Sequence, residues 1–121
     1  MKTNYLVLIL AWLFLFGCRK DVEKPQLSKP PGCDSAGFSY EIEIRPLIIA
    51  NCSGLSCHSG GNSNNNFLEY EELSDRIRNG RLEERLLLPE SDPMHMPFKR
   101  KMESCDVFVL RTWIHQGYKQ N

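Results

Sequence analysis

Two cysteines and a histidine lie close together near the middle of this 121-residue chain, in the order Cys52-Ser-Gly-Leu-Ser-Cys57-His58. Thiols and imidazoles are ligands for soft and borderline metals, and thiols also form disulfides and thioethers. The chain contains five Cys and three His. The chemistry that these two residue types support is therefore the first functional question.

The segment is compatible with three kinds of chemistry. Two Cys followed directly by His are typical of covalent haem attachment, in which both thiols form thioethers and the imidazole binds the iron. The usual spacing has two residues between the Cys, whereas four intervene here, with a glycine among them that permits a bulge. Alternatively, Cys52 and Cys57 form a small disulfide loop, or they join His58 in a zinc site completed by His95 or His115.

Residues 1–17 have the features of an export signal. Lys2 precedes an uncharged apolar run over 5–16, which is too short to span a bilayer and is typical of the apolar core of a secretory signal. The run ends in Leu-Phe-Gly-Cys18, which resembles the lipobox of bacterial lipoproteins. The resemblance implies that Cys18 is acylated and anchors an exported protein to a bacterial membrane, facing the periplasm or the cell exterior. An ordinary signal peptide, or a short anchor helix with an incidental Cys, is the alternative.

The rest of the chain is predicted to form a tether followed by one domain. Residues 18–32 are rich in Pro, Lys and other charged residues, which favours an extended tether. Residues 33–121 are too few for two independent domains and are expected to form one. Fifteen basic and fifteen acidic residues give a net charge of +0, so we expect no nucleic-acid partner.

Short helices joined by long loops are expected to position the motif. Ser39 is predicted to cap one helix and Pro46 to lie in the first turn of the next. The range 52–66 is expected to be a loop, Asn79-Gly80 a turn and 90–100 an irregular segment. No alternating pattern predicts a sheet, so the expected class is all-α. The remaining predicted helices span 67–77, 81–88 up to Pro89, and 106–117, the last with Val107, Leu110, Trp113 and Ile114 along one face and His115 turned to solvent.

Several segments, in order, resemble those of small bacterial cytochrome c domains. The stretch from Ser39 to Cys52 is similar to their first helix, an Ile-x-Pro-Ile-Leu run that ends in Asn-Cys. Met96-Pro97 matches their downstream Met-Pro, and 111–117 resembles their closing helix with its Trp-Ile-x-x-Gly ending. Lipoprotein members of this family also carry the widened Cys-x4-Cys-His form. The similarity extends from Cys33 to the C-terminus.

This resemblance implies a cytochrome c-like fold wrapped around one covalently bound haem c. The implied function is electron transfer with redox partner proteins, without enzymatic activity. The family pattern indicates Met96 as the distal iron ligand, and its neighbours Met94 and His95 are the alternatives. The implied haem-binding residues are Cys52 and Cys57 as thioether attachment points, His58 as the proximal iron ligand and Met96 as the distal one.

Two cysteines, Cys33 and Cys105, remain once lipid and haem are assigned. Family members pair a Cys at the start of the domain with one before the last helix, so the resemblance implies a Cys33–Cys105 disulfide. An exported protein would keep such a bond. Two free thiols are the alternative.

Two further functions stay open at the level of sequence. If Met96 does not bind the iron, a five-coordinate haem would bind peroxide or a small gas, as in a peroxidase-like enzyme. If Cys52 and Cys57 pair with each other, the protein would be a haem-free structural or binding lipoprotein. The basic run 99–101 either borders the haem edge and attracts an acidic redox partner or is a solvated turn.

Overall fold

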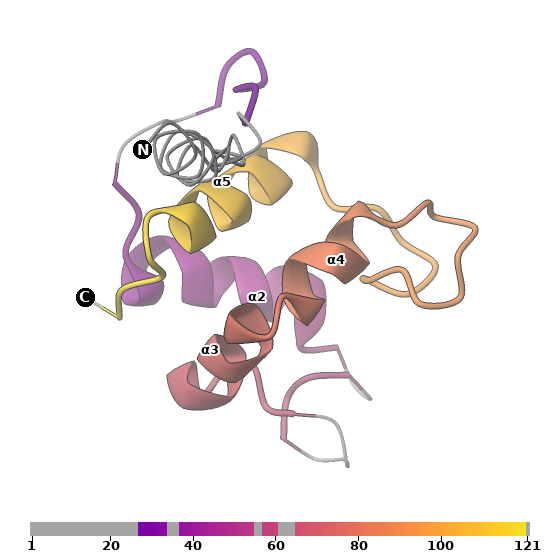
Figure 1. Cartoon of the computed structure of the whole chain (residues 1–121), viewed down its shortest axis with the longest axis horizontal. Coiled ribbons are helices and arrows are strands. Elements are labelled where there is room, and N and C mark those ends of the chain that lie inside the picture. The colour runs from indigo at the N-terminus through magenta and orange to yellow at the C-terminus, as the bar shows by residue number, and fades with distance from the viewer. Residues whose placement is uncertain (1–26, 34–36, 55–56, 61–64, 121) are drawn as a thin grey trace, which may run out of the picture.

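The computed structural model describes residues 27–33, 37–54, 57–60 and 65–120 (Figure 1). Every regular element in these ranges is helical, which confirms the all-α prediction. Cys18, the predicted export signal and most of the predicted tether lie outside the described residues. No helix within the described ranges has the length and apolar character needed to cross a membrane. The elements are η1 (Tyr40–Ile44), α2 (Arg45–Cys52), α3 (Tyr70–Arg78), α4 (Arg81–Leu87) and α5 (Ser104–His115).

The first two helices follow each other without a break and begin at the predicted cap. The Ser39 hydroxyl accepts a hydrogen bond from the amide of Ile42 at 3.3 Å, and the Glu43 carboxylate accepts one from the amide of Ser39 at 2.7 Å. This reciprocal arrangement satisfies amides that have no partner at the start of a helix. Pro46 lies in the first turn of α2, where a missing N–H costs nothing.

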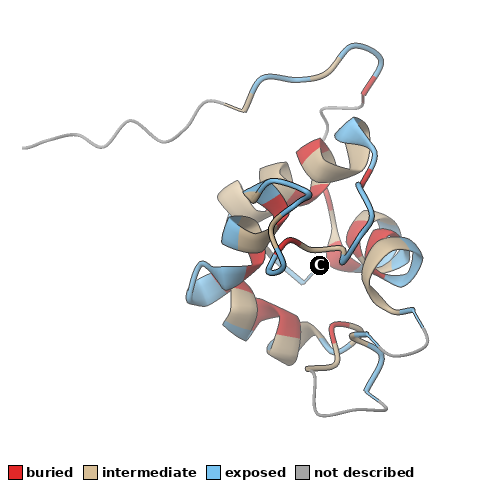
Figure 2. Cartoon of the chain, turned by 90° about the vertical axis from the view of Figure 1, so that its right-hand side faces the viewer, coloured by how far each residue is buried: buried red, intermediate tan, exposed pale blue. Residues whose placement is uncertain are grey.

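An aromatic cluster joins the first and last helices of the domain. Trp113 of α5 is 1% exposed and stacks on Tyr40 of η1, with 6.1 Å between ring centroids. Tyr70 of α3 meets Tyr40 edge to face at 5.4 Å. Figure 2 shows buried residues on the helix faces that look toward one another. Trp113 is therefore part of the core, as its place on the apolar face of the helix indicates.

The hairpin of α3 and α4 differs from its prediction most at the start of α3, while the ends of α3 and α4 each differ by one residue. The helix expected from residue 67 begins at Tyr70, because Asn66 Oδ1 accepts a hydrogen bond from the amide of Leu68 at 3.1 Å and keeps this stretch in a turn. Gly80 links the two helices with φ of +73°, a left-handed conformation that glycine adopts readily. The predicted turn at residues 79–80 is confirmed.

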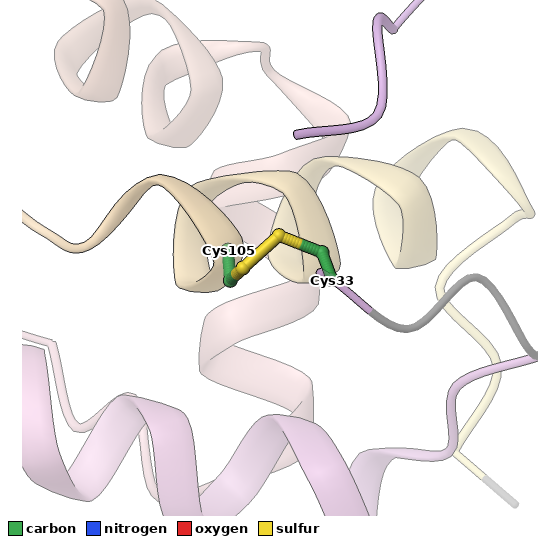
Figure 3. The surroundings of a disulfide bond; sticks show 2 residues. All are labelled: Cys33 and Cys105. Carbon is green, nitrogen blue, oxygen red and sulfur yellow. A yellow bond between two sulfur atoms is a disulfide. The ribbon is translucent and has the colours of Figure 1, made fainter. Parts of the chain in front are cut away.

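A disulfide joins Cys33 to Cys105 in the first turn of α5, with their Cα atoms 5.4 Å apart (Figure 3). The bond spans 72 residues of sequence and attaches the start of the domain to its closing helix. The pairing that the family resemblance implied is confirmed. Residues 88–103, between α4 and α5, form an irregular segment that projects to one side of the molecule (Figure 1).

Candidate functional site

The two thiols of the motif lie at the end of α2 and in the loop that follows it. Cys52 is the last residue of α2 and packs against the hydrophobic core, whereas Cys57 is exposed, and both are free thiols. The amide of Cys57 donates to the Gly54 carbonyl at 2.8 Å, and the amide of His58 donates to the Cys52 carbonyl at 3.0 Å. The second of these hydrogen bonds brings the backbone of His58 back to the end of α2.

The thiol of Cys52 is shielded from water. Burial raises its pKa to about 12, although the nearby positive charge of Arg100 acts in the opposite direction. Cys52 is consequently a protonated thiol at neutral pH.

Two contacts orient the ring of His58, and a third holds its backbone. Its Nδ1 lies 3.1 Å from the carbonyl oxygen of Asn65, and its ring stacks on Phe67 with centroids 3.8 Å apart and an interplanar angle of 2°. The amide of Phe67 also donates to the His58 carbonyl at 3.0 Å. Because a carbonyl only accepts, the Asn65 contact assigns the ring proton to Nδ1 and leaves the lone pair on Nε2. Burial lowers the pKa of His58, which favours the neutral form that binds metals.

Met96 lies in the irregular segment and is half-buried. Its amide donates to the carbonyl of Arg85 at 3.1 Å, which ties the segment to α4. Met94, the neighbouring alternative, is 47% exposed, and its amide donates to the Asp92 carboxylate at 2.7 Å.

His95 is only 6% exposed, and backbone carbonyls face both of its ring nitrogens. Nδ1 lies 2.8 Å from the oxygen of Leu88, and Nε2 lies 3.3 Å from the oxygen of Arg100. The ring thereby bridges the two ends of the irregular segment.

Arg100 connects the Met96 segment with the Cys motif. Its guanidinium donates to the carbonyls of Ala50 at 3.3 Å and Asn51 at 2.8 Å, which are exposed at the C-terminal end of α2 beside Cys52. A cation is favourable at this end of a helix. The sequence offered no sign of this contact, because Arg100 is one of three adjacent basic residues with no helical pattern.

The other two basic residues of the run 99–101 are exposed. The ammonium of Lys99 lies 5.1 Å from the ring centroid of Phe98, and that of Lys101 lies 3.8 Å from the Glu90 carboxylate. Met102, which follows them, is 3% exposed and belongs to the core. Its burial could not be predicted from the sequence, because Met102 lies in no periodic pattern.

His115 does not face solvent as predicted. Its Nε2 lies 2.9 Å from Glu83 Oε1, and Arg111 Nε donates to the same oxygen at 2.7 Å. The prediction was wrong because α4 packs beside this face of α5 and brings a carboxylate to it. Burial by itself would raise the pKa of Glu83, but the hydrogen bonds from His115 and Arg111 outweigh it and hold that pKa below its usual value.

The residues of the alternative zinc site are not assembled. In the described part of the chain, no group of three or more His, Cys, Asp or Glu side chains is placed to hold a metal ion. Both His95 and His115 make the other hydrogen bonds given above. Comparison of the chain with protein-family models, with curated proteins and with solved structures found no match.

Proposed function

We propose that this chain is a membrane-anchored monohaem c-type cytochrome that carries electrons. The observation that supports this most strongly is the environment of His58. Its Nδ1 proton is donated to a backbone carbonyl, and no described residue makes a hydrogen bond with Nε2. A histidine that binds a metal characteristically donates its other ring N–H in this way.

The chain's own residues fit haem c attachment. Cys52 and Cys57 are both free thiols, and the hydrogen bond from the His58 amide to the Cys52 carbonyl places His58 beside the end of α2. In this proposal the two thiols form the thioethers, and the Nε2 atom of His58 binds the iron. Haem c bound there would supply one-electron redox chemistry.

Met96 is the proposed sixth ligand. Its thioether is a soft, neutral group that suits haem iron and favours the ferrous state. His95 is less suitable, because its two nitrogens already face the carbonyls of Leu88 and Arg100. With both axial positions occupied, the protein would have no open site for a substrate and would act as a carrier rather than as an enzyme.

The proposed location is a bacterial membrane, with a lipid anchor at Cys18 and the domain facing the periplasm or the cell exterior. The sequence of the lipobox supports this anchor, and the Cys33–Cys105 disulfide fits an oxidising compartment outside the cytosol. Redox proteins in the same compartment would be the partners.

Covalent attachment can be tested by coexpressing the full chain with a haem-attachment system and staining a denaturing gel for haem. We expect a stained band for the natural sequence and none for the Cys52→Ala/Cys57→Ala double variant, because no thioether can form without the two thiols. The Cys33→Ala/Cys105→Ala double variant is the matched control, which removes two other cysteines and should retain the stain.

An unstained band from well-exported natural protein would contradict the proposal. Mass spectrometry of that protein would then show whether Cys52 and Cys57 are joined in a disulfide, as in a haem-free lipoprotein.

A further inference from the structure

Two neighbouring asparagines in the loop that contacts His58 make hydrogen bonds with side chains on one face of α3. The Arg76 guanidinium donates to the side-chain oxygen of Asn65, and the Glu72 carboxylate accepts a hydrogen bond from the amide of Asn66 at 2.6 Å. Glu72 and Arg76 are four residues apart, so their side chains lie on the same face of the helix. These four residues, Asn65, Asn66, Glu72 and Arg76, are called the α3 clamp below.

The clamp leaves little freedom to Asn66. Its side-chain oxygen accepts a hydrogen bond from the amide of Leu68 at 3.1 Å. A Cβ atom added to Gly60 would lie 2.9 Å from Asn66 Nδ2, so the chain next to His58 passes close to this amide. The backbone of 65–66 is thus held from α3, and Gly60 lies close to the side chain of Asn66.

Asn65 is also the residue whose carbonyl orients His58. The carbonyl oxygen lies 3.1 Å from Nδ1 of His58, while the side chain of Asn65 accepts from Arg76. We propose that Arg76 and Glu72 are positioning residues, which fix the Asn65 carbonyl and thereby set the orientation of His58 and the strength with which it donates electrons. The effect on electron donation rests on the proposed haem function, whereas the effect on orientation does not.

The expected direction of the change in reduction potential follows from the hydrogen bond between His58 Nδ1 and the Asn65 carbonyl. A strong Nδ1–H···O contact increases electron density at Nε2, which stabilises the ferric state and lowers the reduction potential. Loosening the clamp should weaken that contact and raise the potential. Substitution of a residue that hydrogen-bonds a metal-binding side chain typically costs on the order of 10- to 100-fold in metal affinity or activity.

Arg76→Gln tests the clamp, with Arg78→Gln as the matched control. Arg78 lies on the same helix and pairs with the exposed Asp75. In the full chain without haem, we expect hydrogen exchange of the His58 Nδ1 proton, measured by NMR, to become on the order of tenfold faster in Arg76→Gln and to stay unchanged in Arg78→Gln. In the haem-loaded chain, Arg76→Gln should raise the ferrous-to-ferric ratio at a fixed potential by about three- to tenfold.

Two further variants distinguish positioning from general stability. Glu72→Gln should shift both measurements in the same direction as Arg76→Gln, and Asn65→Asp, which keeps an acceptor for Arg76, should preserve the natural values. If circular dichroism shows that Arg76→Gln does not fold, Arg76→Lys is used as the test variant. Lys keeps the positive charge but lacks the planar donor group of Arg.

Equal exchange rates and equal potentials in the Arg76 and Arg78 variants would overturn the positioning role, even if haem is attached. If the natural chain attaches no haem, the proposed function fails, and the exchange measurement on the haem-free chain still decides whether the clamp orients His58.

Discussion

At the scale of single residues, the three histidines occupy three different hydrogen-bonding environments. His58 has one ring nitrogen bound to a carbonyl, His95 has carbonyls at both, and His115 is bonded to a carboxylate. A metal needs a nitrogen with a free lone pair. The carbonyls of Leu88 and Arg100 occupy both nitrogens of His95, and of the other two histidines only His58 follows directly on the Cys motif, which makes it the proposed iron ligand.

The distal ligand can be tested with Met96→Ala in the haem-loaded protein. We expect the sulfur-to-iron charge-transfer band of the ferric protein to disappear, since the substitution removes the Met96 thioether. The reduced variant should also gain carbon monoxide binding, because the sixth position opens.

Met94→Ala is the matched control and should keep the band, as Met94 is 47% exposed. A natural protein without this band would show that Met96 is not bound. If that protein also binds carbon monoxide when reduced, the peroxidase-like alternative gains support.

At the scale of elements, an ionic cluster joins α4 to α5. Glu83 of α4 accepts from both Arg111 and His115 of α5 through the same oxygen, and side-chain exposures of 17–24% make the contact partly buried. The amide of Met96 donates to the carbonyl of Arg85 on the same helix. The cluster therefore helps to place the helix on which the Met96 segment rests.

Glu83→Gln should lower the free energy of unfolding by about 1–3 kcal/mol at neutral pH, because Arg111 loses a charged acceptor in a partly buried site. The lowered pKa of Glu83 means that its contribution is present above the unfolded pKa of the carboxyl and is lost as the pH falls through the folded value. The variant should consequently lose less stability than the natural protein on acidification. Denaturant unfolding at several pH values measures both effects.

Glu84→Gln, which changes the exposed neighbour on α4, is the control and should leave stability nearly unchanged. Identical unfolding of the two variants would show that the cluster contributes nothing measurable.

At the scale of the whole molecule, few residues form the core and one covalent bond closes it. The domain has fewer than ninety residues and no sheet among those described, so its apolar core is small. Domains of this size are commonly stabilised by disulfides or cofactors. The Cys33–Cys105 bond is one such constraint, and the proposed haem would be another.

Removing the bond with Cys33→Ala/Cys105→Ala should reduce the free energy of unfolding by about 4 kcal/mol, the value expected for a loop of this length in the chain-entropy model. Denaturant unfolding of the two proteins in the same haem state measures it. Alkylation of both cysteines without prior reduction in the natural protein would contradict the bond itself.

Much of the fold could be predicted because its signals are local. The Ser39 cap, Pro46 in a first turn, the turn at Asn79-Gly80 and the apolar face of α5 each depend on residues within a few positions of one another. The start of α3 was missed because the side chain of Asn66 competes with the helix for a backbone amide. Such competition depends on the conformation around Asn66 and not on helix propensity alone.

The site was predictable to a different extent. The motif of Cys52, Cys57 and His58 is contiguous, so its residue types and spacing could be recognised directly. The residues that orient it could not, since Arg76, Glu72 and Arg100 are ordinary charged residues in the sequence. They acquire roles only through contacts with Asn65, Asn66 and the end of α2.

The sequence by itself determined the helical class, the approximate helix positions and the set of residues with redox or metal-binding chemistry, because periodicity, caps and motif spacing are properties of neighbouring residues. Only the tertiary structure decided that Cys33 and Cys105 are in bonding distance, that His95 and His115 are engaged elsewhere and that α3 holds the loop behind His58. Those outcomes depend on packing between segments that lie far apart in sequence. The packing of the helices around a common core determines which distant residues come close enough to form a hydrogen bond or a disulfide.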